Sequence, residues 1–263
     1  MLSGLNAGRT LPPPIGGETQ MTDIAEAPDR DLAVRAGDSL RRIRERHPRV
    51  HCLTNTVAQA LTANMLLAAG AIPAMSMALD EIEAMVAGSG ALVVNLGTLD
   101  EARRAAMARA VAVAGEHRKP WVLDPVMVDR APARLAFART LLAQRPAVVR
   151  GNSDEITALG DLDTVVAETG AVDVVRDTTR AIRLAGGHPL MARVTGLGCA
   201  ASALVAAFCA VEDDPLQAAA QALLVLGRGA ELAAAAAAGP ASFQVALLDR
   251  LYSLDTEILE ATP

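Results

Sequence analysis

Ala91-Leu92-Val93-Val94-Asn95 and Trp121-Val122-Leu123-Asp124 are two short apolar runs that each end in a polar residue. Both are continuous enough in Val and Leu to be strands buried on two faces, which is typical of parallel sheets. The segment between them, residues 100–116, has the pattern of a helix. A strand, a helix and a second strand joined by a few residues form the repeating unit of a parallel α/β fold.

The same alternation extends along most of the chain. We expect further strands at residues 50–54, 71–77 and 147–150, and further helices at residues 31–46, 57–69, 80–87, 135–143 and 153–159. After Gly170 the alternation weakens, because residues 173–180 form a poor strand and only the short run 181–184 follows. Helices are expected at residues 199–211 and 215–238, with a short one after 239–243. We therefore predict an α/β fold with a mainly parallel central sheet and helices on both faces.

The composition is that of a folded protein whose core is built from small side chains. Of 263 residues, 52% are hydrophobic and 21% charged, whereas only 2% are aromatic. The net charge of −6 argues against a nucleic-acid or anionic-membrane partner. No apolar run approaches the roughly 18–20 residues of a membrane span. Three cysteines without a pairing pattern fit a reducing compartment, so we expect a cytoplasmic protein.

The first residues differ in composition from the rest. The segment Leu11-Pro12-Pro13-Pro14-Ile15-Gly16-Gly17 lies in a stretch without the basic start and apolar core of a secretory signal. We interpret residues 1–30 as a flexible N-terminal extension, within which Met21 is a second possible start. Residues 31–263 are expected to form a single domain.

Polar residues recur at the ends of successive predicted strands: Asn55, Asn95, Asp124, and Arg150 with Asn152. Right-handed crossovers place the loops that follow parallel strands on one edge of the sheet, so these side chains should converge there. This regularity predicts a functional site at the carboxyl edge of the sheet.

The motif Val194-Thr195-Gly196-Leu197-Gly198-Cys199 precedes an apolar, small-residue helix. Two glycines in this position allow a tight turn that aims several N–H groups at one point, and the helix dipole adds to this anion site. Cys199 falls in the first turn, where we expect a lowered thiol pKa. The pattern suits phosphoryl transfer to an alcohol. A structural glycine pair beside a buried cysteine remains the alternative.

Three further groups could hold metal or phosphate, and each has a structural alternative. Asn152 and Glu155 fit an N-cap with a capping-box acid, or a Mg²⁺ site that acts partly through water. Asp124 either caps the following segment or binds a metal or hydroxyl group. Arg150 forms either a surface ion pair or a phosphate clamp, and its place between a buried strand and Gly151 favours the clamp.

Seven segments together resemble the hydroxyethylthiazole kinase family, in order, from about residue 31 to residue 255. They are Cys52-Leu53-Thr54-Asn55-Thr56-Val57 with residues 61–75, Leu96-Gly97-Thr98-Leu99, Trp121-Val122-Leu123-Asp124-Pro125-Val126, Arg150-Gly151-Asn152-Ser153-Asp154-Glu155, Gly187-His188-Pro189-Leu190-Met191, Gly196-Leu197-Gly198-Cys199-Ala200 and Gly239-Pro240-Ala241-Ser242-Phe243. The resemblance implies a ribokinase-like fold. It also implies Mg-ATP-dependent phosphorylation of the hydroxyl of 4-methyl-5-(2-hydroxyethyl)thiazole in thiamine salvage, by a homotrimer with sites between subunits.

The resemblance also implies roles for single residues. Cys199 stands where related sugar kinases keep an aspartate base, so it would orient or deprotonate the substrate hydroxyl. The remaining expectations are Met75, Gly196 and Asn55 for the thiazole; Arg150, Thr195, Gly198 and Arg176 for ATP; and Asn152, Glu155 and Asp124 for Mg²⁺.

This chain departs from the family pattern between residues 155 and 180. Relatives carry a strand ending in Val-Thr-Gly, whose Thr contacts ATP, whereas here Gly170 leads almost directly into the hairpin-like residues 173–177. Leu197 and Ala241 also replace a common Thr and Gly. We therefore expect a missing strand and a thin nucleotide wall. Two other hypotheses follow: a thiazole-binding relative that no longer transfers phosphate, and a kinase of another small alcohol such as the hydroxymethylpyrimidine.

Overall fold

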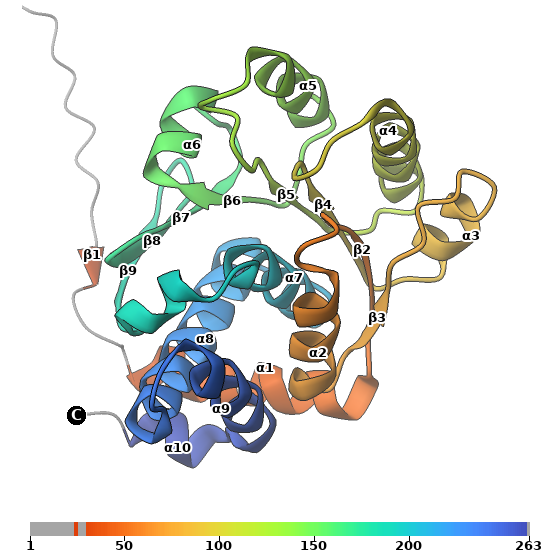
Figure 1. Ribbon diagram of the computed structural model, residues 1–263. Helices are drawn as coiled ribbons and strands as arrows, with labels where there is room; N and C mark the ends of the chain where they lie inside the picture. Colours follow the sequence, from red (N-terminus) through yellow and green to blue (C-terminus); the bar gives the residue numbers. More distant parts are fainter. Residues whose placement is uncertain (1–23, 26–29, 262–263) are drawn as a thin grey trace, which may run out of the picture.

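The computed structural model describes residues 24–25 and 30–261 (Figure 1). Within these residues the strands form a single sheet in the order β1-β9-β8-β7-β6-β5-β4-β2-β3. The strands are β1 (Ile24–Ala25), β2 (Arg49–Leu53), β3 (Ile72–Ala74), β4 (Ala91–Asn95), β5 (Trp121–Asp124), β6 (Val148–Asn152), β7 (Val165–Thr169), β8 (Val172–Arg176) and β9 (Ala181–Ala185).

The sheet is mainly parallel, as predicted. Strands β2 to β7 pair with their neighbours in parallel, whereas β8 runs antiparallel to both β7 and β9. The register places Asn95 beside Asp124 and Asn152 beside Thr169, so β4 ends level with β5, and β6 ends level with β7.

Helices cover both faces of this sheet, which confirms the expected architecture (Figure 1). One layer contains α3 (Ile82–Ala87), α4 (Glu101–Glu116), α5 (Pro132–Leu142) and α6 (Ser153–Leu159). The other layer contains α1 (Arg30–Arg46), α2 (Gln59–Ala69), α7 (Leu197–Cys209), α8 (Pro215–Ala236), α9 (Pro240–Ser253) and α10 (Thr256–Glu260), with the short 3₁₀ helix η1 (Pro189–Arg193) beside them. No helix in the described part of the chain is long and apolar enough to cross a membrane.

Helix α7 is the central helix of the larger layer. It packs against β2, β4 and β5 on one side and against α2 and α8 on the other. Almost all of its residues are buried, and alanine is the most frequent of them. Small side chains let the helix approach its neighbours closely, so a core with few aromatic residues still packs densely. This packing fixes where the amino terminus of α7, and with it Cys199, meets the edge of the sheet.

The expected absence of a strand before Gly170 is wrong. Residues 165–169 form β7, which pairs with β6 along its whole length and turns through Gly170 and Ala171 into β8. Thr169 and Gly170 thus end a strand in the sheet, with Glu168 before them. The run Val165-Val166-Ala167 was an apolar β-type pattern that could have revealed it.

Two smaller expectations also change. The exclusion of residues 1–30 from the fold is wrong at Ile24–Ala25, which pair in parallel with β9, and at Arg30, which begins α1; residues 1–23 and 26–29 lie outside the described residues. The predicted strand 71–77 shortens to β3 at residues 72–74. Gly70 ends α2 with a φ of 96°, the left-handed conformation that favours glycine.

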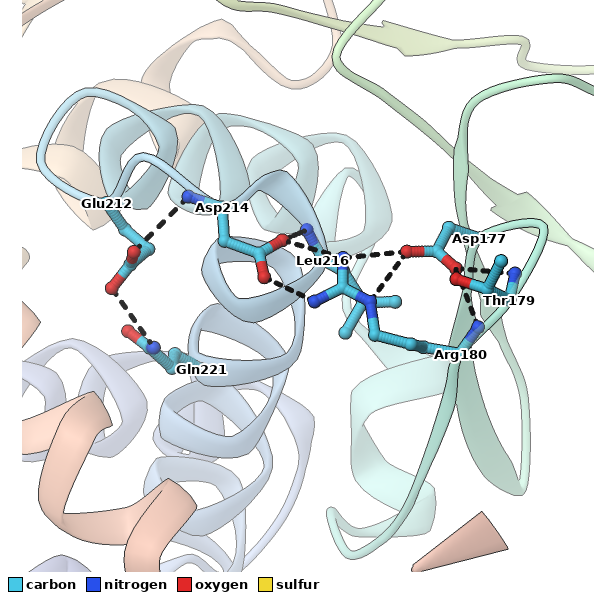
Figure 2. Close-up of polar contacts among 7 residues, drawn as sticks. All are labelled: Asp177, Thr179, Arg180, Glu212, Asp214, Leu216 and Gln221. Carbon is cyan, nitrogen blue, oxygen red and sulfur yellow. Dashed lines mark hydrogen bonds and ion pairs between the residues drawn. The ribbon is translucent and has the colours of Figure 1, made fainter. Parts of the chain in front are cut away.

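The turn between β8 and β9 is attached to the amino terminus of α8 through Arg180 (Figure 2). The Arg180 guanidinium donates to both carboxylate oxygens of Asp214 at 2.5 and 3.2 Å, and to Asp177 at 2.9 Å. Asp214 is the N-cap of α8 and accepts the backbone N–H of Leu216. One arginine therefore links the antiparallel end of the sheet to the helical layer.

Candidate active site

A chain of hydrogen bonds crosses the carboxyl edge of the sheet. Asn95, at the end of β4, donates to the Oδ2 of Asp124, at the end of β5, at 2.7 Å. Asn55, which follows β2, donates from its Nδ2 to the Oδ1 of Asn95 at 3.1 Å and to the Sγ of Cys199 at 3.0 Å. Ser202 of α7 also donates to Asp124 Oδ2, at 2.8 Å. The predicted convergence at this edge is confirmed for Asn55, Asn95 and Asp124.

Asp124 lies in a buried, polar environment. Its side chain is almost inaccessible, and this burial raises the pKa of Asp124 to about 6. The positive charge of Arg150 and the hydrogen bonds from Ser202 and Asn95 act in the opposite direction and favour the carboxylate. At neutral pH the group is therefore ionised, although it takes up a proton far more readily than an exposed aspartate.

Cys199 lies in the first turn of α7, directly after Gly196, Leu197 and Gly198. Gly196 has a φ of 79°, and a Cβ atom there would lie 3.0 Å from the Cα of Ala58, so only glycine allows this turn. The expected lowering of the thiol pKa is not found: burial and the nearby Asp124 carboxylate raise the pKa of Cys199. Hydrogen bonding to Asn55 and Asn95 and the charge of Arg150 oppose this rise without cancelling it.

Arg150 connects β6 to the same helix terminus. Its Nη2 donates to the Oγ1 of Thr169 at 2.7 Å, while its buried Nε has no partner within the described residues. A Cβ atom at Gly198 would lie 2.9 Å from Arg150 Nη1. The guanidinium therefore lies across the glycine turn, with a donor free for an anion.

A cavity of about 650 Å³ opens beside Arg150 and Gly198. Thr169, Gly170 and Asp173 lie at the β7–β8 end of its wall, and Arg228 and Glu231 of α8 lie in the wall as well. Glu231 accepts the backbone N–H of Gly187 at 3.1 Å and pairs with Arg228. Most of the remaining lining is apolar, including Leu184, Leu197, Leu223, Leu224 and Leu226. An apolar slot with cationic groups in its wall can hold a planar ring attached to phosphates.

Asn152 and Glu155 form the N-cap and capping box of α6. Asn152 Oδ1 accepts the N–H of Glu155 at 2.9 Å, and Glu155 Oε2 accepts the N–H of Asn152 at 3.0 Å. The second carboxylate oxygen of Glu155 accepts the N–H of Met127 at 2.9 Å. No cluster of three or more His, Cys, Asp or Glu side chains that could hold a metal occurs in the part of the chain that the structure describes.

The other predicted site residues lie in three different places. Met75 follows β3 and is half-buried, next to the strand that leads to Asn55. Thr195 is exposed at the turn before α7 and does not line the cavity. Arg176 pairs with Val166, three residues before Thr169 on β7, and is likewise absent from the cavity lining. The structure therefore brings Arg150 and Gly198 to the cavity, but not Thr195 or Arg176.

Thr169 and Ser202 were not predicted at this edge, and Asn95 was predicted there but was given no role in the site. Thr169 was missed with its strand, although a Thr-Gly pair after an apolar run marks a strand end. Asn95 was identified only by its place at a strand end. Ser202 lies inside an apolar helix, where nothing in the sequence pattern distinguishes it from its neighbours.

Comparisons with known proteins give a family and a fold for this chain. A model described as the hydroxyethylthiazole kinase family matches residues 40–163 and 160–257. The probable hydroxyethylthiazole kinase of Agrobacterium fabrum is 50% identical over 230 residues, which cover 87% of this chain and 94% of that protein. A solved structure of a hydroxyethylthiazole kinase protein from Pyrococcus horikoshii has a TM-score of 0.85 at 39% identity and covers 87% of this chain and 96% of its own. A ribokinase-like superfamily protein from Enterococcus faecalis, at a TM-score of 0.62 and 13% identity, shares the fold.

Proposed function

This chain belongs to the hydroxyethylthiazole kinase family, and we propose that it transfers the terminal phosphoryl group of ATP to the hydroxyl of 4-methyl-5-(2-hydroxyethyl)thiazole in thiamine synthesis or salvage. The observation that carries this proposal is the shared position of Arg150, Gly198 and Cys199. Arg150 and Gly198 line the cavity, and Cys199 follows Gly198 at the amino terminus of α7. A nucleotide in the cavity and an alcohol beside Cys199 would meet at that terminus.

In this reaction the substrate oxygen forms a bond to the terminal phosphorus as the bond to the bridging oxygen of ADP breaks. Negative charge on the transferring group is stabilised by the Arg150 guanidinium and by the backbone N–H groups at the start of α7. The hydroxyl proton passes to Cys199 Sγ, or is directed by it, and ADP leaves with the displaced electron pair. Burial raises the pKa of Cys199, so the thiolate, which is the base form, is a minor species at neutral pH and becomes more populated as the pH rises.

In this proposal the thiazole lies at the other side of the amino terminus of α7. Gly196 and Asn55 lie together, since a Cβ atom at Gly196 would meet Ala58, whose backbone N–H is bound by Asn55 Oδ1. Met75 follows the neighbouring strand β3. Thr195 and Arg176 do not line the cavity, so the geometry supports them less than Arg150 and Gly198 as residues that contact ATP.

Mg²⁺ fits the oxygen donors of this edge as a partly hydrated ion. Asn152, Glu155 and Asp124 offer amide and carboxylate oxygens, and Mg²⁺ in kinases keeps several waters and binds substrate phosphates rather than a closed protein cage. When bound, Mg²⁺ neutralises phosphate charge. Glu155 and Asn152, already held by the capping box, would orient its water ligands.

The chain is further proposed to act as a cytoplasmic homotrimer with its thiazole sites between subunits. Strand β3 is an edge of the sheet, and the apolar side chains Val57, Leu67, Ile72 and Leu79 around it are exposed. Exposed apolar groups beside a sheet edge favour contact with another chain. The three free cysteines support a reducing location.

The hypothesis of a thiazole-binding protein without kinase activity loses its motivation. It depended on a missing strand, and β7 is present with Thr169 bonded to Arg150. The relatives named as hydroxyethylthiazole kinases favour the thiazole alcohol over another small alcohol as the substrate.

The test is a coupled assay of ADP formation with Mg-ATP and the thiazole alcohol, beside the hydroxymethylpyrimidine alcohol and simple sugars. We expect turnover with the thiazole alcohol and at least about a hundredfold lower kcat/KM with the others. Tight thiazole binding without nucleotide binding or turnover would contradict the kinase proposal.

A further inference from the structure

Two backbone N–H groups define the orientation of two amide side chains beside Cys199. The N–H of Gly97 donates to Asn95 Oδ1 at 3.0 Å, and the N–H of Ala58 donates to Asn55 Oδ1 at 3.0 Å. Because a backbone N–H cannot accept a hydrogen bond, each contact identifies the oxygen end of its amide. The nitrogen ends are thereby assigned as well.

With the amide nitrogens assigned, a chain of hydrogen bonds runs from Asp124 through Asn95 and Asn55 to Cys199. Asn95 Nδ2 faces the Asp124 carboxylate, and Asn95 Oδ1 receives Asn55 Nδ2. An amide nitrogen carries two hydrogens, and the second hydrogen of Asn55 is directed at Cys199 Sγ. Asn95 is fully buried and Asn55 is 6% exposed, so water does not readily replace these bonds.

Gly97 leaves the space that this arrangement needs. A Cβ atom at Gly97 would lie 2.7 Å from the Cβ of Asn55 and 2.9 Å from its Nδ2. The residue that orients Asn95 through its N–H therefore also makes room for the Asn55 side chain.

We propose that Asn95 is a positioning residue for Cys199: it holds the Asn55 amide so that its second N–H donates to the sulfur and stabilises the thiolate. This role rests on the proposed function, in which Cys199 accepts or directs the proton of the substrate hydroxyl. The charged groups that face Cys199 are Asp124 and Arg150, which oppose each other in sign. The Asn55 amide carries no charge, so its hydrogen bond stabilises the thiolate separately from the opposed charges of Asp124 and Arg150.

The first test measures the thiol itself. The rate of alkylation of Cys199 by iodoacetamide is followed by mass spectrometry of the Cys199 peptide. The pH range is about 7 to 11.5, which extends above an ordinary thiol pKa because the pKa of Cys199 is raised. The proteins are the parent, Asn95→Ala, Asn55→Ala and the double variant. Losing a hydrogen bond to a charged acceptor should raise the pKa of Cys199 by about one pH unit in each single variant.

The double variant separates positioning from a general structural role. If Asn95 acts through Asn55, the double variant should match Asn55→Ala, because the relay is already broken. Additive rises in the thiol pKa would show that Asn95 lowers the pKa of Cys199 directly rather than through Asn55. That result, or an unchanged profile in Asn95→Ala, would overturn the proposal.

Gly97→Ala tests the same relay without removing a polar group, and so remains informative if Asn95→Ala does not fold. It should displace Asn55 and raise the thiol pKa, whereas Gly115→Ala should not, because a Cβ atom there meets nothing within 4 Å. Steady-state kinetics should show about a tenfold lower kcat in Asn95→Ala with an unchanged KM for ATP. A parent protein without turnover would refute the proposed function, while the alkylation profiles would still decide the role of Asn95.

Discussion

Arg150 places a positive charge in the candidate active site, beside the Gly198 turn. Its guanidinium is held by Thr169 on one side and lies against the Gly198 turn on the other, yet its Nε has no partner among the described residues. An unpaired buried donor is costly unless a ligand completes it, so the position is better explained by a bound anion than by fold stability alone.

Arg150→Ala should weaken binding of a non-hydrolysable ATP analogue by about 10- to 100-fold, the value of a lost charge-assisted hydrogen bond. Thiazole binding should change by less than about threefold, since the thiazole residues lie beyond the helix terminus. Isothermal titration of each ligand measures both. Arg183→Ala is the matched control, because Arg183 is exposed on β9 and does not line the cavity. Equal losses for both ligands would indicate a structural role for Arg150.

The second prediction at the residue scale concerns the thiol of Cys199. Because its pKa is raised, activity that depends on the thiolate should increase with pH above neutrality. Cys199→Ser and Cys199→Ala should lower kcat by about 10²- to 10⁴-fold, the typical loss of a general base. Cys199→Asp should retain turnover and lose the alkaline increase, because a carboxylate is ionised over that range. Similar activity of the parent, Ser and Ala variants across the pH profile would contradict the catalytic assignment.

At the scale of elements, Arg180 joins the β8–β9 turn to α8 by forming ion pairs with Asp177 and Asp214 (Figure 2). Partial burial opposes the charge of Asp177, but the N–H groups of Thr179 and Arg180 and the Arg180 guanidinium lower its pKa to about 2. The pKa of Asp214 is also lowered, as its bonds to Arg180 and to the N–H of Leu216 outweigh burial. Both carboxylates therefore favour the folded state only while ionised.

Asp214→Ala should lower the free energy of unfolding by about 1–2 kcal/mol, because α8 loses its N-cap and the turn loses its anchor. Asp213→Ala, at the exposed neighbouring position, should change it by less than about 0.5 kcal/mol. The difference between the two variants should be fully present above about pH 4, the ordinary aspartate pKa, and should shrink as the pH falls through the lowered pKa of Asp214. Denaturant unfolding at several pH values measures it, and a difference that persists at the lowest pH would count against the ionic explanation.

At the scale of the molecule, the proposed trimer would bury the exposed apolar side chains around β3, which are Val57, Leu67, Ile72 and Leu79. Light scattering after size-exclusion chromatography should give about three times the chain mass of 27.2 kDa. Leu67→Asp, at a side chain in α2 that belongs to this edge, should shift the protein toward monomers and weaken thiazole binding more than ATP binding. Tyr252→Asp, at the exposed surface of α9, is the control that should leave the mass unchanged. A monomeric parent with full thiazole affinity would refute the trimer.

The local pattern of the chain predicted most of its elements. Strands at residues 91–95 and 121–124 and the helix at residues 153–159 were predicted with the bounds that the structure shows. Continuous apolar runs and caps are properties of neighbouring residues, so they can be recognised without a fold. Strand β7 was missed because it joins β8 through a turn of two residues and carries Glu168 and Thr169 at its end, which weakens the pattern.

The sequence by itself determined the class of fold and the family, since both follow from local periodicity and from motifs in order along the chain. It also placed Asn55, Asn95 and Asp124 at strand ends, because every parallel strand ends at the same edge. Only the tertiary structure decided which of these groups touch, which way each amide points, and whether the Cys199 thiol is acidified. Hydrogen-bond direction and burial arise between segments far apart in the chain, where Asn55 meets Cys199 and Asp124 meets Ser202. No local pattern encodes the desolvation that raises the pKa of Cys199.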